Sequence, residues 1–254
     1  MDEQEVSAAG VRRRVVGMAG EARYDEIADF YAAGWGDVID DPASVRLLDL
    51  LGPVAGRRVL EIACGHGRVS RELARRGARV VAADLAAALI AKAEAAEHAA
   101  PLGVRYLHAD VTDPAALAGL PAFDAVVCSF GLSDTDDLDG AVSNAAAALR
   151  PGGVFVCSLL HPCFPGGPGV SGSWPSEGDY RDEGWWRADG EQSSLRRRVG
   201  ANHRTLATYV GTLRRHGLWV DELAEPEPAP DWAARRPEAA RFPVFLVMRC
   251  VKNV

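Results

Sequence analysis

The segment that most constrains how this chain can fold is residues 58–67, which read RVLEIACGHG. Residues 58–63 are mostly β-branched or aliphatic, a composition typical of a strand buried in the middle of a sheet. Gly65 and Gly67 then allow a tight turn without Cβ clashes, and residues 69–76 follow with helical spacing. The segment therefore predicts a strand, a glycine loop and a helix, an arrangement that brings backbone close to a nucleotide.

The residues around the glycines distinguish between the cofactors that use such a loop. A P-loop needs a Lys followed by Ser or Thr, and this pair does not follow Gly67. A dinucleotide fingerprint needs a third glycine at the position that Ser70 occupies. Glu61 adds a negative charge at the strand end, which favours a cationic ammonium or sulfonium over a pyrophosphate. The loop thus favours a positively charged cofactor.

The same loop resembles the first motif of the class I S-adenosylmethionine-dependent methyltransferases, with Ala63 where a glycine is usual. Four later landmarks agree in order with this family. They are strand ends at Asp84 and Asp110, a strand over residues 123–130, and a turn over residues 149–153. The resemblance covers residues 24–251. It implies an α/β fold with a Rossmann-like, seven-stranded, mostly parallel sheet, helices on both faces and an antiparallel last strand.

The resemblance also implies S-adenosylmethionine as cofactor, S-adenosylhomocysteine as product, and a set of binding residues. In the family, the acid after the second strand accepts hydrogen bonds from the ribose hydroxyls, and the acid and next amide after the third strand bind the adenine edge. The implied cofactor-binding residues are Tyr24, Tyr31, Glu61, Ala63, Cys64, Gly65, Gly67, Asp84, Leu85, Asp110, Val111, Ser129 and Phe130. Asp84 follows the loop by about 20 residues, which also suits the ribose acid of a dinucleotide site, so Asp84 alone does not separate the two cofactors.

The N-terminal part of the chain has two explanations. Tyr24, Ile27, Ala28 and Tyr31 share one face of a predicted helix, which indicates a helix packed on the core. The family resemblance implies instead that these tyrosines cover the methionine end of the cofactor. Residues 1–20 have mixed charge without a clear period, and we expect them to be disordered or loosely attached. We expect residues 21–254 to form one domain.

Strands and helices alternate through the middle of the chain. Further strands are expected near Val104, Phe123 and Val154, and helices over residues 42–51, 85–100, 115–117 and 138–149. This alternation predicts right-handed crossovers and a parallel sheet. Ligands of such sheets bind at the carboxyl ends of the strands, where Glu61, Asp84, Asp110, Ser129 and His161 are all expected.

Residues 162–200 interrupt this alternation and are rich in glycine, proline and large rings. A connection this long without regular structure is usually functional or disordered, and disordered segments are poor in Trp. We interpret the segment as a lid over the substrate, although a satellite core on the sheet edge remains the alternative. The predicted substrate-binding residues are Phe164, Trp174, Tyr180, Trp185 and Trp186.

The last part of the chain should complete the sheet. Residues 204–217 predict a helix that ends at Gly217, and residues 219–223 predict a strand. The proline-rich residues 225–230 should form an extended connector, and residues 242–251 the final strand. The antiparallel pairing of these strands is implied by the family resemblance alone.

Two histidines are candidate catalytic residues, because imidazole titrates near physiological pH and can accept a proton from a hydroxyl or amine. They are His161, at the expected end of the fifth strand, and His203, just before the helix that follows. Both can equally be structural. His161 and Cys163 lack a second pair with zinc spacing, so we predict no metal.

Composition and charge limit the kinds of molecule that we expect the protein to bind. A net charge of −7 argues against a nucleic acid, and we interpret the arginine runs 12–14 and 196–198 as solvated surface. At residues 128–131, CSFG stands where related nucleic-acid enzymes often carry Asn/Asp-Pro-Pro-aromatic. No apolar run is long enough to span a membrane, and the acidic N-terminus lacks a secretory core. Five scattered cysteines suggest a reducing, cytoplasmic location.

The function predicted from these features is methyl transfer to an O, N or C nucleophile of a small, partly apolar metabolite, by a monomer or homodimer. Two alternatives remain open. One is a non-catalytic or repurposed protein that retains the cofactor, because binding residues can survive when the chemistry changes. The other is an NAD(P)-dependent oxidoreductase, which Ser70 and Glu61 disfavour.

Overall fold

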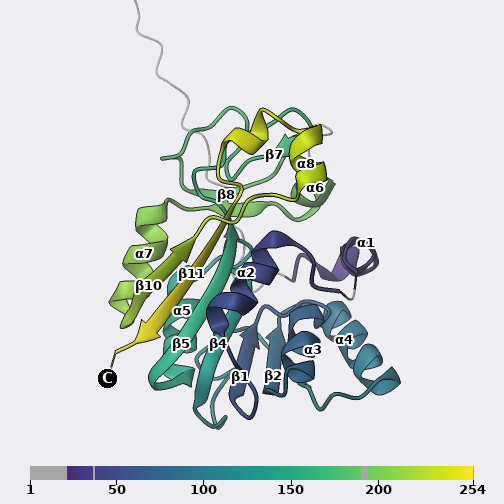
Figure 1. The fold of residues 1–254 in the computed structure, drawn as a ribbon, viewed down its shortest axis with the longest axis vertical. Helices are drawn as coiled ribbons and strands as arrows, with labels where there is room; N and C mark the ends of the chain where they lie inside the picture. Colours follow the sequence, from purple (N-terminus) through teal and green to yellow (C-terminus); the bar gives the residue numbers. More distant parts are fainter. Residues whose placement is uncertain (1–21, 37, 190–193, 254) are drawn as a thin grey trace, which may run out of the picture.

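The computed structural model describes residues 22–36, 38–189 and 194–253 (Figure 1). The expected loose attachment of residues 1–20 concerns residues outside these ranges. A seven-stranded sheet forms the centre of the molecule, in the order β10-β11-β5-β4-β1-β2-β3. Its strands are β1 (Arg58–Ile62), β2 (Arg79–Asp84), β3 (Arg105–His108), β4 (Phe123–Ser129), β5 (Leu149–Leu160), β10 (Leu218–Ala224) and β11 (Phe245–Lys252).

The pairing of the strands confirms the predicted fold class. β1 pairs in parallel with β2 and β4, and β2 with β3 and β4 with β5 do the same. Only β11 is reversed, because it runs antiparallel to both β5 and β10. The sheet is therefore Rossmann-like and mostly parallel, with an antiparallel last strand.

Helices cover both faces of this sheet, which explains why β1 is buried from Val59 to Ile62. Val59 packs into a cluster with α2 (Pro42–Leu51), α3 (Arg68–Arg75) and α4 (Ala87–Ala99). Leu60 and Ile62 point to the other face and pack with α5 (Leu138–Ala148) and α7 (Leu206–Arg215). Successive β1 side chains thus enter opposite halves of the core, and the carboxyl end of the strand is held rigidly.

Three local expectations differ from the structure. Residues 115–117 form turns rather than a helix, in a segment where the Asp113 side chain accepts a hydrogen bond from the Ala115 amide at 2.9 Å. The N-terminal helix is split into a 3-10 turn (Asp25–Ile27) and α1 (Ala28–Ala33). The extended connector ends at Ala229, because Pro230 begins α8 (Pro230–Arg235) at the position where a helix needs no amide donor.

Residues 162–204 are not structureless. They contain two short antiparallel pairs, β6 (Gly166–Gly167) with β7 (Val170–Ser171) and β8 (Gly184–Trp186) with β9 (Ala201–His203), and a helix, α6 (Ser194–Val199). Figure 1 shows this segment and α8 together above the carboxyl ends of β4 and β5. We call the described residues of 162–204 and 230–241 the cap.

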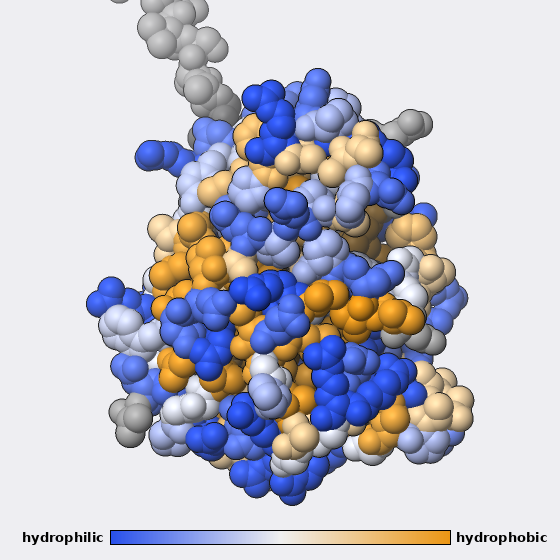
Figure 2. All heavy atoms as spheres, viewed as in Figure 1, coloured by the Kyte–Doolittle hydropathy of each residue, from blue (hydrophilic) through white to orange (hydrophobic). Residues whose placement is uncertain are grey.

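The surface shows no large apolar face on the side seen in Figure 2, where polar atoms are interspersed with a band of apolar atoms below the cap. Exposed apolar side chains include Val45, Leu223 and Phe242. Among the described residues, no helix combines the length and the apolar character that a bilayer crossing needs.

Candidate functional site

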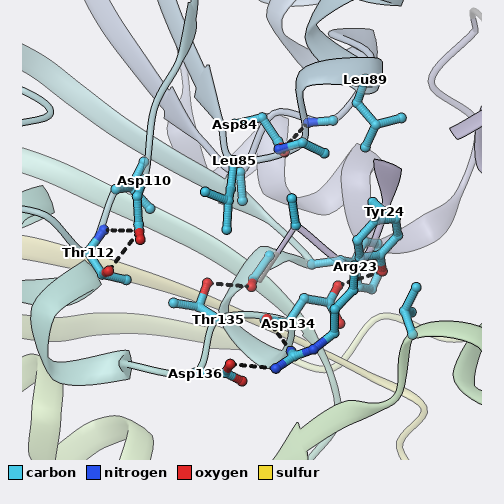
Figure 3. Close-up of a pocket in the computed structure, with 18 of the residues that line it drawn as sticks. Arg23, Tyr24, Asp84, Leu85, Leu89, Asp110, Thr112, Asp134, Thr135 and Asp136 are labelled. Atoms are coloured by element: carbon cyan, nitrogen blue, oxygen red, sulfur yellow. Dashed lines mark hydrogen bonds and ion pairs between the residues drawn. The ribbon is translucent and has the colours of Figure 1, made fainter. Parts of the chain in front are cut away.

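A cavity of about 960 Å³, counting its open mouth, lies at the carboxyl ends of β1 to β4 (Figure 3). We call it the first cavity. The predicted cofactor residues that line it are Tyr24, Tyr31, Ala63, Gly65, Asp84, Leu85, Asp110, Val111, Ser129 and Phe130. The strand ends therefore bring ten residues from five chain segments to one place.

The glycine loop has the backbone that its sequence predicts. Gly65 and Gly67 have φ angles of 57° and 85°, in the left-handed region that glycine adopts without strain. A Cβ atom on Gly67 would lie 2.3 Å from the Tyr106 hydroxyl, so the second glycine is also required for space. Gly67 supports the loop from behind and is not among the residues that line the first cavity.

Ala63 is the residue that departs from the usual glycine motif, and the structure compensates for its methyl group. Ala63 has a φ of 53°, a left-handed conformation that costs an L-residue roughly 1–2 kcal/mol. A Cβ on Gly131 would lie 2.3 Å from the Ala63 Cβ. Gly131, which begins the short helix after β4, therefore leaves the space that the Ala63 methyl group occupies.

The Asp84 carboxylate is fixed by the backbone on both sides. Its Oδ2 accepts a hydrogen bond from the Gly65 amide at 2.7 Å, and its Oδ1 accepts one from the Ala86 amide at 2.8 Å. Burial raises its pKa above the ordinary value, and these two hydrogen bonds act in the opposite direction. A carboxylate oxygen has a second lone pair, so each oxygen can still accept one hydroxyl.

Asp110 and its neighbours form the next part of the wall. Asp110 Oδ1 accepts hydrogen bonds from the Thr112 amide at 2.9 Å and the Thr112 hydroxyl at 2.7 Å. Figure 3 shows Asp110 and Thr112 on a different side of the cavity from Asp84 and Leu85. The wall at this point offers a carboxylate next to apolar Val111, which suits a flat, polar-edged ring.

Glu61 lies deeper than the sequence suggested. Its side chain is 1% exposed and, with Cys64, lines an adjoining pocket rather than the first cavity. Burial raises the Glu61 pKa to about 8, although a hydrogen bond from the Ser70 hydroxyl lowers it. The carboxyl is therefore largely neutral at pH 7 in the protein alone. The expected attraction to a cation requires Glu61 to lose its proton when that cation binds.

Tyr24 and Tyr31 pack on the core, as the first explanation of the N-terminal segment expects, and their position beside a cavity leaves the second explanation a prediction. They pack against the start of α4 through Ala86 and Leu89, and they also line the first cavity. Their rings meet edge to face at 5.0 Å, and the Tyr31 ring lies 5.8 Å from that of His66 in the glycine loop. Burial raises the pKa of both hydroxyls, so both stay protonated.

Sequence reasoning missed a set of paired charges that closes the first cavity. The Tyr24 hydroxyl donates to Asp134 at 2.8 Å, Arg196 forms an ion pair with Asp134, and Arg23 forms one with Asp136 at 2.5 Å. We call these five residues the clasp. Figure 3 shows Arg23 reaching toward Asp134 and Asp136 across the cavity. The clasp joins the N-terminal segment, the loop after β4 and the cap.

The clasp corrects one interpretation of the sequence. Arg197 and Arg198 are exposed, but Arg196 is partly buried against Asp134, so the arginine run is not solvated throughout. Asp134, Asp136 and Asp137 were visible a few residues after the fourth strand. Their partners lie 62 and 113 residues away in the chain, at distances that no local pattern relates.

The two candidate histidines differ in their surroundings. His161 Nδ1 accepts a hydrogen bond from the Cys163 amide at 3.0 Å, so the proton is on Nε2, which contacts Glu225 Oε1 at 3.0 Å. Burial lowers the His161 pKa, and Glu225 partly offsets this. Both ring nitrogens are engaged, and His161 is not among the residues that line the first cavity. His203 lines a second cavity below the cap.

The predicted substrate-binding rings form much of the interior of the cap. Phe164 is fully buried against Ala239 and Val244, in the satellite core that was the alternative to a lid. Trp174 and Tyr180 pack edge to face on His203. Trp185 lies under the Arg23 guanidinium at 5.5 Å, and Trp186 lines the second cavity. None of the five rings is among the residues that line the first cavity.

The chain is similar in sequence to known methyltransferases. The methyltransferase domain family matches residues 59–153, which run from β1 into the first part of β5. An uncharacterized methyltransferase of Mycobacterium bovis is 34% identical over 144 residues, which cover 55% of this chain and 70% of that protein. A demethylmenaquinone methyltransferase of Clavibacter sepedonicus is 36% identical over 120 residues, or 45% of this chain. That match spans 46% of the relative, a little under half its length.

A solved structure extends the similarity beyond the matched segments. The S-adenosylmethionine-dependent methyltransferase from Mesorhizobium loti superposes with a TM-score of 0.64 at 29% identity, over 83% of this chain and 96% of that one. The common fold therefore includes most of the sheet and its helices.

Proposed function

The chain belongs to the family of S-adenosylmethionine-dependent methyltransferases, and we propose that it transfers a methyl group from S-adenosylmethionine to an O, N or C nucleophile of a small, partly apolar metabolite. The observation that carries this proposal is the first cavity, where Gly65, Asp84 and Asp110 converge from the ends of β1, β2 and β3. The product left in the cavity is S-adenosylhomocysteine.

The residues around the first cavity fit such a cofactor. We assign Asp84 to the two ribose hydroxyls, because its two oxygens are held by backbone amides and each keeps a lone pair. We assign Asp110 and Val111 to the adenine, and Ala63, Gly65, Ser129 and Phe130 to the methionine portion with Tyr24 and Tyr31 above them. Glu61, Cys64 and Gly67 support this loop from below.

When bound, S-adenosylmethionine supplies a methyl group on a positively charged sulfonium, which a nucleophile displaces in line. The protein's part is then to orient, to exclude water and, where the acceptor needs it, to take a proton. The clasp closes the first cavity over its contents, and the cap covers the acceptor side. Of the two candidate bases, His203 is better placed, because it lines a cavity and His161 has both nitrogens occupied.

Three further features belong to the same proposal. A small acceptor agrees with the relative named demethylmenaquinone methyltransferase and with the mostly enclosed cavity, and we propose no nucleic-acid substrate. The protein acts as a monomer or homodimer. It works in the cytoplasm, where its free cysteines, four of them buried, would stay reduced.

The test is methyl uptake from S-adenosylmethionine labelled in the methyl group, with a panel of small hydroxyl, amine and carbon acceptors. We expect labelled product and an equal amount of S-adenosylhomocysteine for at least one acceptor. Asp84→Ala should abolish both signals. Tight binding of S-adenosylmethionine without turnover of any acceptor would instead indicate a protein that retains the cofactor for another purpose.

A further inference from the structure

The second cavity, of about 300 Å³ counting its open side, lies between the sheet and the cap. Its walls come from Ser133 after β4, from Leu160 and Pro162 at the end of β5, and from the cap residues Trp186 and His203. It adjoins the first cavity, because Ser133 precedes Asp134 in the chain and Arg196, which lines the second cavity, pairs with Asp134 in the first. A molecule held there would lie beside the cofactor.

His203 contributes an unpaired acceptor to this wall. The residue is 1% exposed, and its Nε2 lies 2.8 Å from the Tyr180 carbonyl oxygen. A carbonyl only accepts, so Nε2 carries the proton and the neutral ring presents a lone pair at Nδ1. Nδ1 has no hydrogen-bond partner among the described residues. Glu183, which accepts hydrogen bonds from the hydroxyls of Thr205 and Thr208, interacts electrostatically with this ring.

Trp186 contributes an unpaired donor. It is 7% exposed, and its indole Nε1 has no partner within the described part of the chain. An indole N–H only donates. A buried polar group left in this state costs about 1–3 kcal/mol, so the cap carries two such costs on residues that line the second cavity.

The two arginines that line the second cavity already bind other groups of the protein. Arg204 donates to the carbonyl oxygens of Leu132 at 2.9 Å, Thr135 at 2.7 Å and Asp136 at 2.8 Å. Arg196 pairs with Asp134. These arginines position the loop after β4. The polar atoms that can select a ligand are therefore His203 Nδ1 and Trp186 Nε1.

We propose that the second cavity is the acceptor subsite and that it takes a hydroxyl group, as in a phenol, an enol or an alcohol. The hydroxyl oxygen accepts from Trp186 Nε1, and its proton is donated to His203 Nδ1. This assignment rests on the proposed methyl transfer. An ammonium ion cannot accept from the indole, and a carboxylate cannot donate to the imidazole. A neutral aryl amine has both functions, but its delocalised lone pair is a weaker acceptor.

The transfer balances with these residues. A lone pair of the hydroxyl oxygen forms the new O–CH3 bond, and the electron pair of the broken S–CH3 bond returns to sulfur, which becomes the neutral thioether of S-adenosylhomocysteine. The hydroxyl proton passes to His203 Nδ1, which becomes imidazolium while Nε2 still donates to Tyr180, and it is later released to water. His203 is then a catalytic residue and Trp186 an orienting one.

The test uses phenol, aniline and toluene as matched probes, titrated into the protein saturated with S-adenosylhomocysteine. Binding is followed by NMR of the ¹⁵N-labelled His203 ring and Trp186 indole. We expect phenol to bind at least about tenfold more tightly than toluene, as two buried hydrogen bonds require, with shifts at Nδ1 and Nε1. His203→Asn and Trp186→Phe should each remove most of that preference, whereas His98→Gln, on the exposed side of α4, should not.

The possible outcomes distinguish a failure of the hydroxyl subsite from a failure of the proposed methyl transfer. Phenol that binds no better than toluene, or whose preference survives His203→Asn, overturns the hydroxyl subsite. If S-adenosylhomocysteine binds and amines are methylated while phenol is not, the inference is also wrong, but methyl transfer stands. Failure of S-adenosylhomocysteine to bind would contradict both.

Discussion

The two walls of the site are held by different kinds of interaction. On the cofactor side, Asp84 is fixed by the amides of Gly65 and Ala86, 19 and 2 residues away in the chain. On the cap side, Arg196 and Arg23 reach acids 62 and 113 residues away through their side chains. On the cofactor side, one side chain is held by backbone amides, whereas each contact on the cap side needs two matched side chains. The cofactor wall therefore depends on a single carboxylate, and the cap wall depends on several pairs of residues.

Asp84→Ala should have the largest effect, because it removes the carboxylate on which the cofactor wall depends. The substitution deletes the ribose acceptors and leaves the buried Gly65 amide without its partner. Charge-assisted hydrogen bonds contribute about 1.5–3 kcal/mol each, so the affinity for S-adenosylhomocysteine should fall by roughly 100-fold or more. Calorimetry measures this, with the exposed Asp49→Ala on α2 as control. Unchanged affinity would remove Asp84 from the cofactor site.

Gly131→Ala tests whether the Ala63 methyl group is compensated across the cavity floor. The new Cβ would lie 2.3 Å from the Ala63 Cβ, and such overpacking costs about 1–3 kcal/mol of unfolding free energy. Ala63→Gly alone should be tolerated, since it relieves a positive φ. The double variant should recover much of the loss in urea denaturation. An equal loss from Gly131→Ala in both backgrounds would show that the two sites are independent.

Glu61 should make the stability of the cofactor wall depend on pH. Its pKa is raised from 4.5 to about 8 by burial, so between these values the unfolded chain releases a proton that the folded protein keeps. The contribution is complete below about pH 4.5 and is lost as the pH rises toward 8. Urea denaturation at pH 5 and pH 8 should show a loss on the order of 2 kcal/mol that Glu61→Gln removes. An identical loss in the variant would contradict the assignment.

Asp134→Asn should loosen the cap wall and leave the cofactor wall unchanged. The substitution weakens the pair with Arg196 and the acceptor for Tyr24, both partly shielded from water. We expect amide hydrogen exchange in α6 and β9 to accelerate by about tenfold, the equivalent of 1.4 kcal/mol, with little change in β1 and β2. Asp139→Asn breaks an exposed pair with Arg215 and serves as the control. Equal acceleration in β1 would mean that the walls are not separable.

The same contrast explains what the sequence could and could not predict. The parallel strands around the glycine loop, with Asp84 and Asp110 at strand ends, follow from apolar periodicity and the family resemblance, and the reversed last strand follows from the resemblance alone. The order of the strands in the sheet was not predicted. The clasp could not be predicted, because the pairing of Arg23 and Arg196 with acids depends on how the cap folds back over β4. The neutral state of Glu61 also depends on burial, which a strand-end position does not reveal.

The aromatic residues of the cap were recognised as a group but not by their individual places. Their number in a glycine-rich segment indicated a lid over the substrate, with a satellite core as the alternative, and the segment contains short strands of its own. Phe164 fills the interior because it packs against Ala239 and Val244, far along the chain, and Trp186 borders a cavity that residues after β4 and at the end of β5 help to form. Periodicity carries no information about such contacts in irregular chain.

The most direct test of the central claim is calorimetric titration of the purified protein with S-adenosylmethionine, S-adenosylhomocysteine and NADH under the same conditions. The first cavity, with Asp84 for the ribose and a glycine loop that lacks the third glycine of a dinucleotide site, predicts that both sulfur compounds bind and NADH does not. Binding of NADH alone would contradict the assignment of the cofactor wall.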